Sequence, residues 1–270
     1  MSKSGFPAPA VRGEAPDAWA RLTQSSPVPS PQAKSRAWAH QRMSYHRISL
    51  GQRLGLRRGD ALIVIDVQRD FLPGGSLAIA AGNEVLPRIN AYIAAFDSRG
   101  LPVFLTRDWH PSNHCSFRSA GGRWPPHCIR GTGGAGWPNS LKVLPAARIV
   151  SKGTARGVEG YSGFSGTSLL PLLRKLRVKR LFICGLATDY CVHDTVMDAR
   201  SHNFEVVVLA DAIRGVEAQP GDETRAIMEM IERGATWFQH SAHGEAREQP
   251  IVTDTTGNGA AGRMAGTDLR

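Results

Sequence analysis

The sequence predicts an α/β protein with a doubly wound, mainly parallel sheet and helices on both faces. Two observations carry this prediction. Short, continuous apolar runs recur along the chain, and such runs are typical of strands that are covered on both faces. Segments with a helical apolar period lie between them, and this alternation of strand and helix is typical of a parallel sheet.

The apolar runs place five strands along the chain. We expect strands at ALIVID (61–66), LPVFLT (101–106), ARIVSK (147–152), RLFICG (180–185) and EVVVLAD (205–211). A helical period covers 85–96 and is closed by Gly100, and two more cover 169–176 and 192–199. Active sites in such sheets lie outside the carboxyl ends of the strands.

The chain divides into three expected parts. Its 270 residues, 41% of them hydrophobic, can bury one substantial core, which we place in a single domain at 60–238. The segments 1–59 and 239–270 lack a periodic apolar face, and we expect both to be disordered.

The positive charge is concentrated in the first 59 residues. They hold ten Lys and Arg and two acidic residues, which accounts for +8 of the formal net charge of +10. Three interpretations of this basic extension stay open: disordered sequence with Met43 as an alternative start, a transit peptide, or an anion-binding arm. The nearly neutral remainder argues against a specific nucleic-acid partner.

No apolar run approaches the roughly 20 residues that span a membrane, and no signal-peptide pattern opens the chain. We therefore expect a soluble, cytoplasmic protein without a membrane partner. The four cysteines lack CxxC spacing, and we expect them to be reduced.

Cys191 is the candidate nucleophile. It follows an apolar strand in CGLATDYCV and begins a helical period, where the helix dipole and unpaired amides favour a thiolate. Asp66 and Lys152 end two other expected strands, so a parallel sheet brings all three residues to one edge. Asp66 is suited to act as the general base and Lys152 to hold negative charge. Each residue also has a structural alternative: a buried thiol for Cys191, a helix cap or solubilising strand end for Asp66, and an exposed strand end for Lys152.

The segment 108–145 replaces helical periodicity with Trp, His, Gly and Pro, and its tryptophans argue against disorder. It contains Asp108, His110, His114 and His127. Two or three imidazoles with one carboxylate suit a divalent transition metal, so we expect one zinc, iron or manganese ion here.

Five separated segments resemble one protein family: DVQRDFLPGGSL, TRDWHP, WPPHCIRGT, KG…YSGF and GLATDYCV, in this order. The series is similar to that of the nicotinamidases in the isochorismatase-like cysteine hydrolase superfamily, over roughly residues 60–238. The resemblance implies an isochorismatase-like fold, with catalytic Asp66, Lys152 and Cys191. It also implies the metal ligands Asp108, His110 and His127, and leaves open whether His114 is a ligand or supports the ligands.

The resemblance further implies a cis peptide before Ala187 and an oxyanion hole formed by the amides of Ala187 and Cys191. Phe71, Trp124 and Tyr161 match positions that line the family's pyridine pocket. The stretch 153–160 follows no family pattern, so one wall of the pocket is not assigned.

The function implied by the resemblance is hydrolysis of nicotinamide to nicotinate and ammonia in NAD salvage, through a thioester on Cys191 and with a metal that orients the ring. Two other enzymes fit the residues: an amidase of the same superfamily with another small carboxamide as substrate, and a metallohydrolase in which Cys191 is structural. A non-catalytic module with a basic docking arm is a third hypothesis. The presence of Asp66, Lys152 and Cys191 together argues against that third hypothesis. A homo-oligomer is left open.

Overall fold

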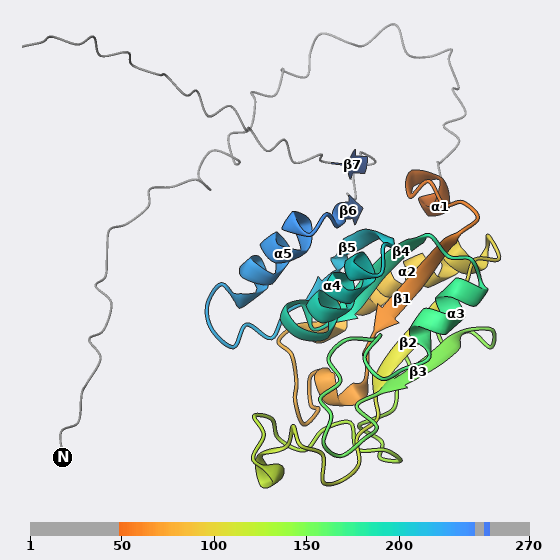
Figure 1. The fold of residues 1–270 in the computed structure, drawn as a ribbon. Helices are drawn as coiled ribbons and strands as arrows, with labels where there is room; N and C mark the ends of the chain where they lie inside the picture. Colours follow the sequence, from red (N-terminus) through yellow and green to blue (C-terminus); the bar gives the residue numbers. More distant parts are fainter. Residues whose placement is uncertain (1–48, 241–245, 249–270) are drawn as a thin grey trace, which may run out of the picture. The chain divides into compact units, whose positions relative to one another are not determined.

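A seven-stranded sheet forms the centre of the structure, a computed structural model that describes residues 49–240 and 246–248 (Figure 1). The strand order is β3-β2-β1-β4-β5-β6-β7. The first six strands in the chain pair in parallel, and β7 pairs antiparallel with β6. The strands are β1 (Asp60–Ile65), β2 (Val103–Asp108), β3 (Arg148–Lys152), β4 (Arg180–Leu186), β5 (Glu205–Arg214), β6 (Thr236–His240) and β7 (Ala246–Glu248).

Helices cover both faces of this sheet (Figure 1). The α-helices are α1 (Leu50–Arg53), α2 (Leu86–Asp97), α3 (Leu169–Lys175), α4 (His193–Ser201) and α5 (Asp222–Glu232). Short turns of other helical types are η1 (Arg69–Phe71), η2 (Gly82–Val85), η3 (Arg118–Ala120) and the π-helical η4 (Thr188–Val192). The predicted fold class, a doubly wound and mainly parallel sheet, is confirmed.

The two cores lie on opposite faces because successive residues of a strand point to opposite sides. In β1, Leu62 and Val64 belong to the core that includes the apolar residues of α2. Ile63 and Ile65 belong to the other core, with residues of α3, α4 and α5. All six residues of β1 are buried, as its unbroken apolar run predicts.

Several elements lie outside the expected ones. Neither α5 nor β6 is among the elements expected from the sequence, and Ala226 and Met230 are the buried residues of α5. Helix α1 lies within the segment 1–59, and the following Leu54 and Leu56 pack into the core. Strand β7 lies within 239–270. The ordered elements therefore extend past 60–238 at both ends, while the rest of both expected tails lies outside the described residues.

The strand order decides where the functional side chains meet. Lys152 and Asp108 end β3 and β2 and are direct register partners, Asp66 follows β1, and Cys191 follows β4. The order β3-β2-β1-β4 therefore lines up these four residues along the carboxyl edge of the sheet. From β1 the chain adds β2 and β3 on one side and then β4, β5 and β6 on the other, so the gap between β1 and β4 is the topological switch point of the sheet. Ligands of α/β sheets bind at such points. In the described part of the chain, no helix is long and apolar enough to cross a membrane.

Candidate active site

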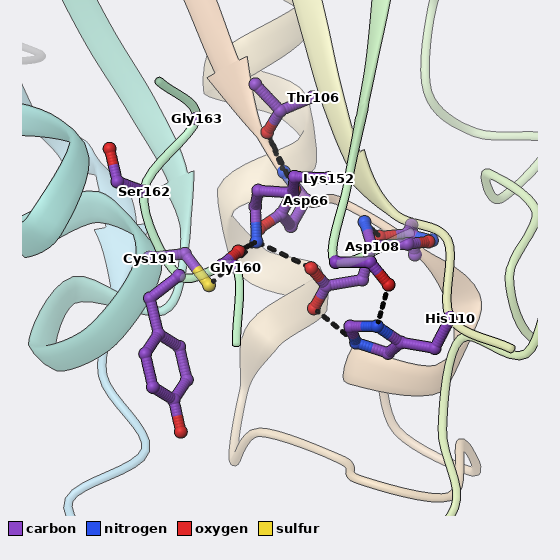
Figure 2. Close-up of polar contacts among 12 residues, drawn as sticks. Asp66, Thr106, Asp108, His110, Lys152, Gly160, Ser162, Gly163 and Cys191 are labelled. Carbon is purple, nitrogen blue, oxygen red and sulfur yellow. Dashed lines mark hydrogen bonds and ion pairs between the residues drawn. The ribbon is translucent and has the colours of Figure 1, made fainter. Parts of the chain in front are cut away.

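The ammonium group of Lys152 lies at the centre of the carboxyl edge (Figure 2). Its Nζ is 2.6 Å from Oδ1 of Asp108, 2.8 Å from Oδ2 of Asp66 and 3.3 Å from Sγ of Cys191. It also donates to the carbonyl oxygen of Gly160 at 2.7 Å. The side chain is fully buried, so two carboxylates, one carbonyl oxygen and the sulfur contact the ammonium in place of water.

The three expected catalytic residues are therefore brought together. The ligand atoms of Asp66, Asp108 and Cys191 lie within 4.8 Å of one another around this lysine. Although burial opposes its charge, Asp108 and Asp66 raise the pKa of Lys152 well above the ordinary value. Lys152 is thus a permanent cation, which is the state needed to hold negative charge.

Asp66 is held by its backbone and by Thr106. Its φ of 47° is in the left-handed region that few residues other than glycine adopt. Oδ1 accepts a hydrogen bond from Oγ1 of Thr106 at 2.7 Å, and the Asp66 amide donates to the same hydroxyl at 3.2 Å. Burial raises the pKa of Asp66 above its ordinary value, against the opposing effect of Lys152. A raised pKa makes this carboxylate a better proton acceptor.

The environment of Cys191 differs from the predicted one. The residue lies inside the π-helical turn η4, which precedes α4, and not at the first position of a regular helix. Burial raises the pKa of its thiol well above the ordinary value, and Lys152 only partly opposes this. Burial therefore opposes the thiolate that a helix start favours, and the carboxylate of Asp66 lies within reach of the sulfur as a base.

His110 and His127 are each bonded to a backbone carbonyl through one ring nitrogen only. Nδ1 of His110 is bonded to the carbonyl of Gly153, and Nδ1 of His127 to the carbonyl of Pro125, both at 2.8 Å. A carbonyl only accepts, so both Nδ1 atoms carry the proton and both Nε2 atoms carry the lone pair. Burial lowers the pKa of His127, which favours the neutral form that binds metals.

These two imidazoles and Asp108 form a set of potential metal ligands. One ligand atom from each of the three residues lies within 4.8 Å of the others, and all three are buried. Nitrogen from two histidines and oxygen from one carboxylate suit a divalent transition metal, and carbonyls that fix the outer ring nitrogens are typical of metal-binding histidines. The residues therefore fit the metal that the sequence resemblance implies.

His114 is placed differently. Its ring stacks on that of His110, with 4.0 Å between the centroids and 23° between the planes. Nδ1 is 2.7 Å from Oγ of Ser116, and Nε2 is 3.0 Å from the carbonyl oxygen of Val158. Both ring nitrogens are thus bonded to the protein.

The expected ring-binding residues line one pocket together with Cys191. Phe71, Trp124 and Tyr161 are joined there by Ala187, Cys191, His127, Asp108, Tyr190, Leu77, Ile79 and Val216. The indole of Trp124 donates to the hydroxyl of Tyr161 at 2.9 Å, which locks two of these aromatic walls together. The peptide bond between Leu186 and Ala187 is cis, as the resemblance implies.

Sequence reasoning missed three contributors to the site. Tyr190 contacts the rings of both Trp124 and Tyr161, at centroid distances of 5.2 and 5.7 Å. Gln68 is fully buried, and its side-chain amide donates to the carbonyl of Asp108 at 2.8 Å and accepts from the Asp108 amide at 2.7 Å. Its place two residues after Asp66 in DVQRDF is the signal that could have found it.

The third missed contributor is the support of the turn that carries Cys191. Thr188 donates to Oε1 of Glu223 on α5 at 2.7 Å. The carboxylate of Asp189 accepts from the amides of Val216 and Glu217 at 2.8 and 2.9 Å. The unassigned helix α5 and the segment before it therefore hold the nucleophile turn in place.

Comparison with known families decides the relationship. The model of the isochorismatase domain matches residues 60–241. This chain belongs to the isochorismatase family. It is similar to a hydrolase of that family, the nicotinamidase of Escherichia coli K12. The two sequences are 38% identical over 199 residues, which cover 66% of this chain and 93% of the relative.

Two further comparisons agree with the resemblance seen in the sequence. The nicotinamidase/pyrazinamidase of Mycobacterium tuberculosis is 39% identical to this chain, in an alignment that covers 63% of this chain and 92% of the relative. The structure of the pyrazinamidase of Pyrococcus horikoshii in complex with zinc is 48% identical, with a TM-score of 0.65 over 67% of this chain and 99% of that chain. The recognition of a nicotinamidase-type member of the superfamily is confirmed.

Proposed function

We propose that the protein hydrolyses nicotinamide to nicotinate and ammonia, as a step of NAD salvage. One observation carries the proposal: Cys191, 3.3 Å from the Lys152 ammonium, lines the same aromatic pocket as Phe71, Trp124 and Tyr161. A flat aromatic amide held in that pocket presents its carboxamide to the thiol. The names of the relatives, nicotinamidases of two bacteria, support the choice of ring.

The first chemical step is attack by sulfur. Asp66, whose pKa is raised by burial, takes the proton of the Cys191 thiol, and the sulfur forms a bond to the carboxamide carbon. The carbonyl π electrons move to oxygen, and the resulting oxyanion is stabilised by Lys152 and by the amides of Ala187 and Cys191. The Cys191 thiol keeps its proton until the sulfur attacks, which is consistent with its raised pKa.

The second part of the reaction releases both products. Asp66 returns its proton to the amide nitrogen, the carbon–nitrogen bond breaks, and ammonia leaves a thioester on Cys191. Asp66 then accepts a proton from water, which attacks the thioester carbon and frees nicotinate. The Cys191 sulfur regains a proton, so the cycle closes with one water consumed.

The metal is assigned to Asp108, His110 and His127. A divalent zinc, iron or manganese ion held there supplies a Lewis-acidic site beside the ring pocket, which His127 and Asp108 also line. The relative from Pyrococcus horikoshii, a structure in complex with zinc, supports zinc as the first candidate. An ion held by these residues would offer a site for the ring nitrogen on the His127 and Asp108 side of the pocket, which Cys191 also lines.

A second substrate follows from the same comparison. The relative that is 48% identical is a pyrazinamidase, and a second relative carries both activity names. Pyrazinamide has the nicotinamide shape with one more ring nitrogen, so we propose that it is accepted as well. An amidase with an unrelated small carboxamide as substrate is the alternative that the test below separates. The cytoplasmic location and the absence of a nucleic-acid partner stay predictions.

Ammonia release from three amides tests the proposed function. The purified full-length protein with measured metal content should hydrolyse nicotinamide and pyrazinamide. Benzamide, which has the same shape but no ring nitrogen, should be hydrolysed at least about 100-fold less efficiently, because the polar anchor of the ring is lost. Equal efficiency on benzamide would contradict the ring assignment, and no release from nicotinamide would contradict the function.

A further inference from the structure

The segment 153–160, which the sequence resemblance left unassigned, supports the site through its backbone. The carbonyl of Gly153 accepts from Nδ1 of His110 at 2.8 Å, and the carbonyl of Gly160 accepts from Nζ of Lys152 at 2.7 Å. The carbonyl of Val158 is 3.0 Å from Nε2 of His114. Because the bonds use main-chain atoms, the side chains of the segment carry no recognisable pattern.

Two glycines show how closely this segment packs. A Cβ on Gly153, where φ is 57°, would lie 2.3 Å from Cε1 of His110. A Cβ on Gly160 would lie 2.5 Å from the amide nitrogen of Gly153. Residues 154–159 between them are exposed. The segment is therefore a loop with fixed ends and an exposed middle, and two bonds attach this middle to residues 114–115: the amide of Cys115 donates to the carbonyl of Arg156 at 2.8 Å, and His114 bonds to the carbonyl of Val158.

The hydrogen bonds of His114 decide which of its nitrogens carries the proton. The backbone amide of Ser116 donates to Nδ1 at 3.3 Å, so Nδ1 carries the lone pair and Nε2 the proton. Nε2 then donates to the carbonyl of Val158, and Nδ1 also accepts from the Ser116 hydroxyl. His110 and His127 have the opposite arrangement, because their Nδ1 atoms are the ones bonded to backbone carbonyls.

We propose that His114 is a positioning residue that latches the middle of the loop 153–160, and that it is not a ligand of the metal. Its Nε2–H holds Val158, and its ring stacks on His110. The same loop holds His110 at Gly153 and Lys152 at Gly160. His114 thus connects the metal ligands with the catalytic lysine through one exposed stretch of backbone.

This inference rests on the metal site of the proposed function, so the test includes a measurement that needs no metal. The exposed Arg156 offers trypsin a cleavage site in the middle of the loop. His114→Phe keeps a ring against His110 but removes all three hydrogen bonds of the imidazole. His127→Ala, which removes a proposed ligand outside the loop, is the matched comparison, and thermal unfolding checks that each variant is folded.

In His114→Phe, we expect cleavage after Arg156, followed by mass spectrometry, to be at least about tenfold faster than in the wild type, because cleavage follows the population of the open loop. The metal content should stay near the wild-type value, whereas His127→Ala should lose most of its metal. We expect kcat to fall about tenfold with KM within about threefold, because Lys152 acts on the reacting atoms.

Metal loss in His114→Phe equal to that in His127→Ala would overturn the inference, as would unchanged cleavage after Arg156. If His114→Phe does not fold, Ser116→Ala tests the same point, because it frees one side of the His114 ring and should accelerate cleavage by a smaller factor without metal loss. Unchanged cleavage in Ser116→Ala would then count against the latch. A wild-type protein that binds no metal would contradict the proposed cofactor but leave the cleavage result valid.

Discussion

The carboxylate of Asp108 lies 2.6 Å from Nζ of Lys152 through Oδ1, while its Oδ2 lies 3.5 Å from Nε2 of His110. Asp108 therefore belongs both to the surroundings of Lys152 and to the potential metal site. Burial raises the pKa of Asp108, but Lys152 holds it below the ordinary value, so the group is a carboxylate at neutral pH.

Asp108→Asn and Asp66→Asn should separate the two functions of these buried carboxylates. Asp108→Asn should lower metal affinity at least about 100-fold, because it removes a charged metal ligand. It should also reduce kcat, because it removes one of the two carboxylates that contact the Lys152 ammonium. Asp66→Asn should reduce kcat at least about 1,000-fold with metal content retained, because only the base is lost. Metal titration and steady-state ammonia release check both. Metal loss in Asp66→Asn would contradict the separation.

The ring-orienting role of the metal site predicts a coupling between His127 and the substrate. In the wild type, nicotinamide should be preferred over benzamide. In His127→Ala, this preference should fall to within about threefold, because the site that recognises the ring nitrogen is lost. The values of kcat/KM for both amides and both proteins give the result. A preference that persists in the variant would show that the ring nitrogen is recognised elsewhere.

The buried thiol predicts a shifted alkylation profile. Iodoacetamide reacts with the thiolate, and burial raises the pKa of Cys191 well above that of an ordinary thiol. The rate at Cys191 in the free protein should therefore continue to rise with pH after the rate in the urea-unfolded protein has levelled off. Cys191→Ala supplies the background from Cys115, Cys128 and Cys184. A plateau at lower pH than in the unfolded chain would contradict the raised pKa.

Two truncations test where the folded domain begins. Removal of residues 1–48 should leave ammonia release within about threefold of the full chain, because the segment precedes the described elements. Removal of residues 1–59 also deletes α1, Leu54 and Leu56, and the two leucines are each only 6% exposed. At roughly 1.5–3 kcal/mol per buried leucine, the longer truncation should lose about 3–6 kcal/mol of unfolding free energy in urea relative to the shorter one. Equal stability of both proteins would contradict the packing of this segment.

Much of the fold could be predicted because central strands such as β1 and β4 are buried and apolar along nearly their whole length. A run such as ALIVID has no other stable place than a covered strand, and Asp66, Lys152 and Cys191 then fall at carboxyl ends. Helix α1 escaped prediction because its four residues are too few for a helical period. Helix α5 carries such a period, because Ala226, Ile227, Met230 and Ile231 recur at helical spacing, so this helix was predictable from the sequence.

The sequence predicted which residues form the site better than it predicted their protonation states. The proton state of Cys191 depends on burial by residues distant in sequence, which no local pattern reports. Which ring nitrogen of His110 and His127 carries the proton depends on carbonyls of Gly153 and Pro125, which any residue provides. The loop 153–160 likewise acts through its backbone, so its contribution is visible only in three dimensions.

The most direct test of the central claim, that the Cys191 thiol attacks nicotinamide, is the kcat/KM for ammonia release by Cys191→Ala relative to the wild type at matched metal content. The account predicts a fall of at least about 10,000-fold, with thermal stability and bound metal unchanged, because the nucleophile is removed and little volume is lost. Activity within about tenfold of the wild type would contradict the account and favour attack by water with a structural cysteine.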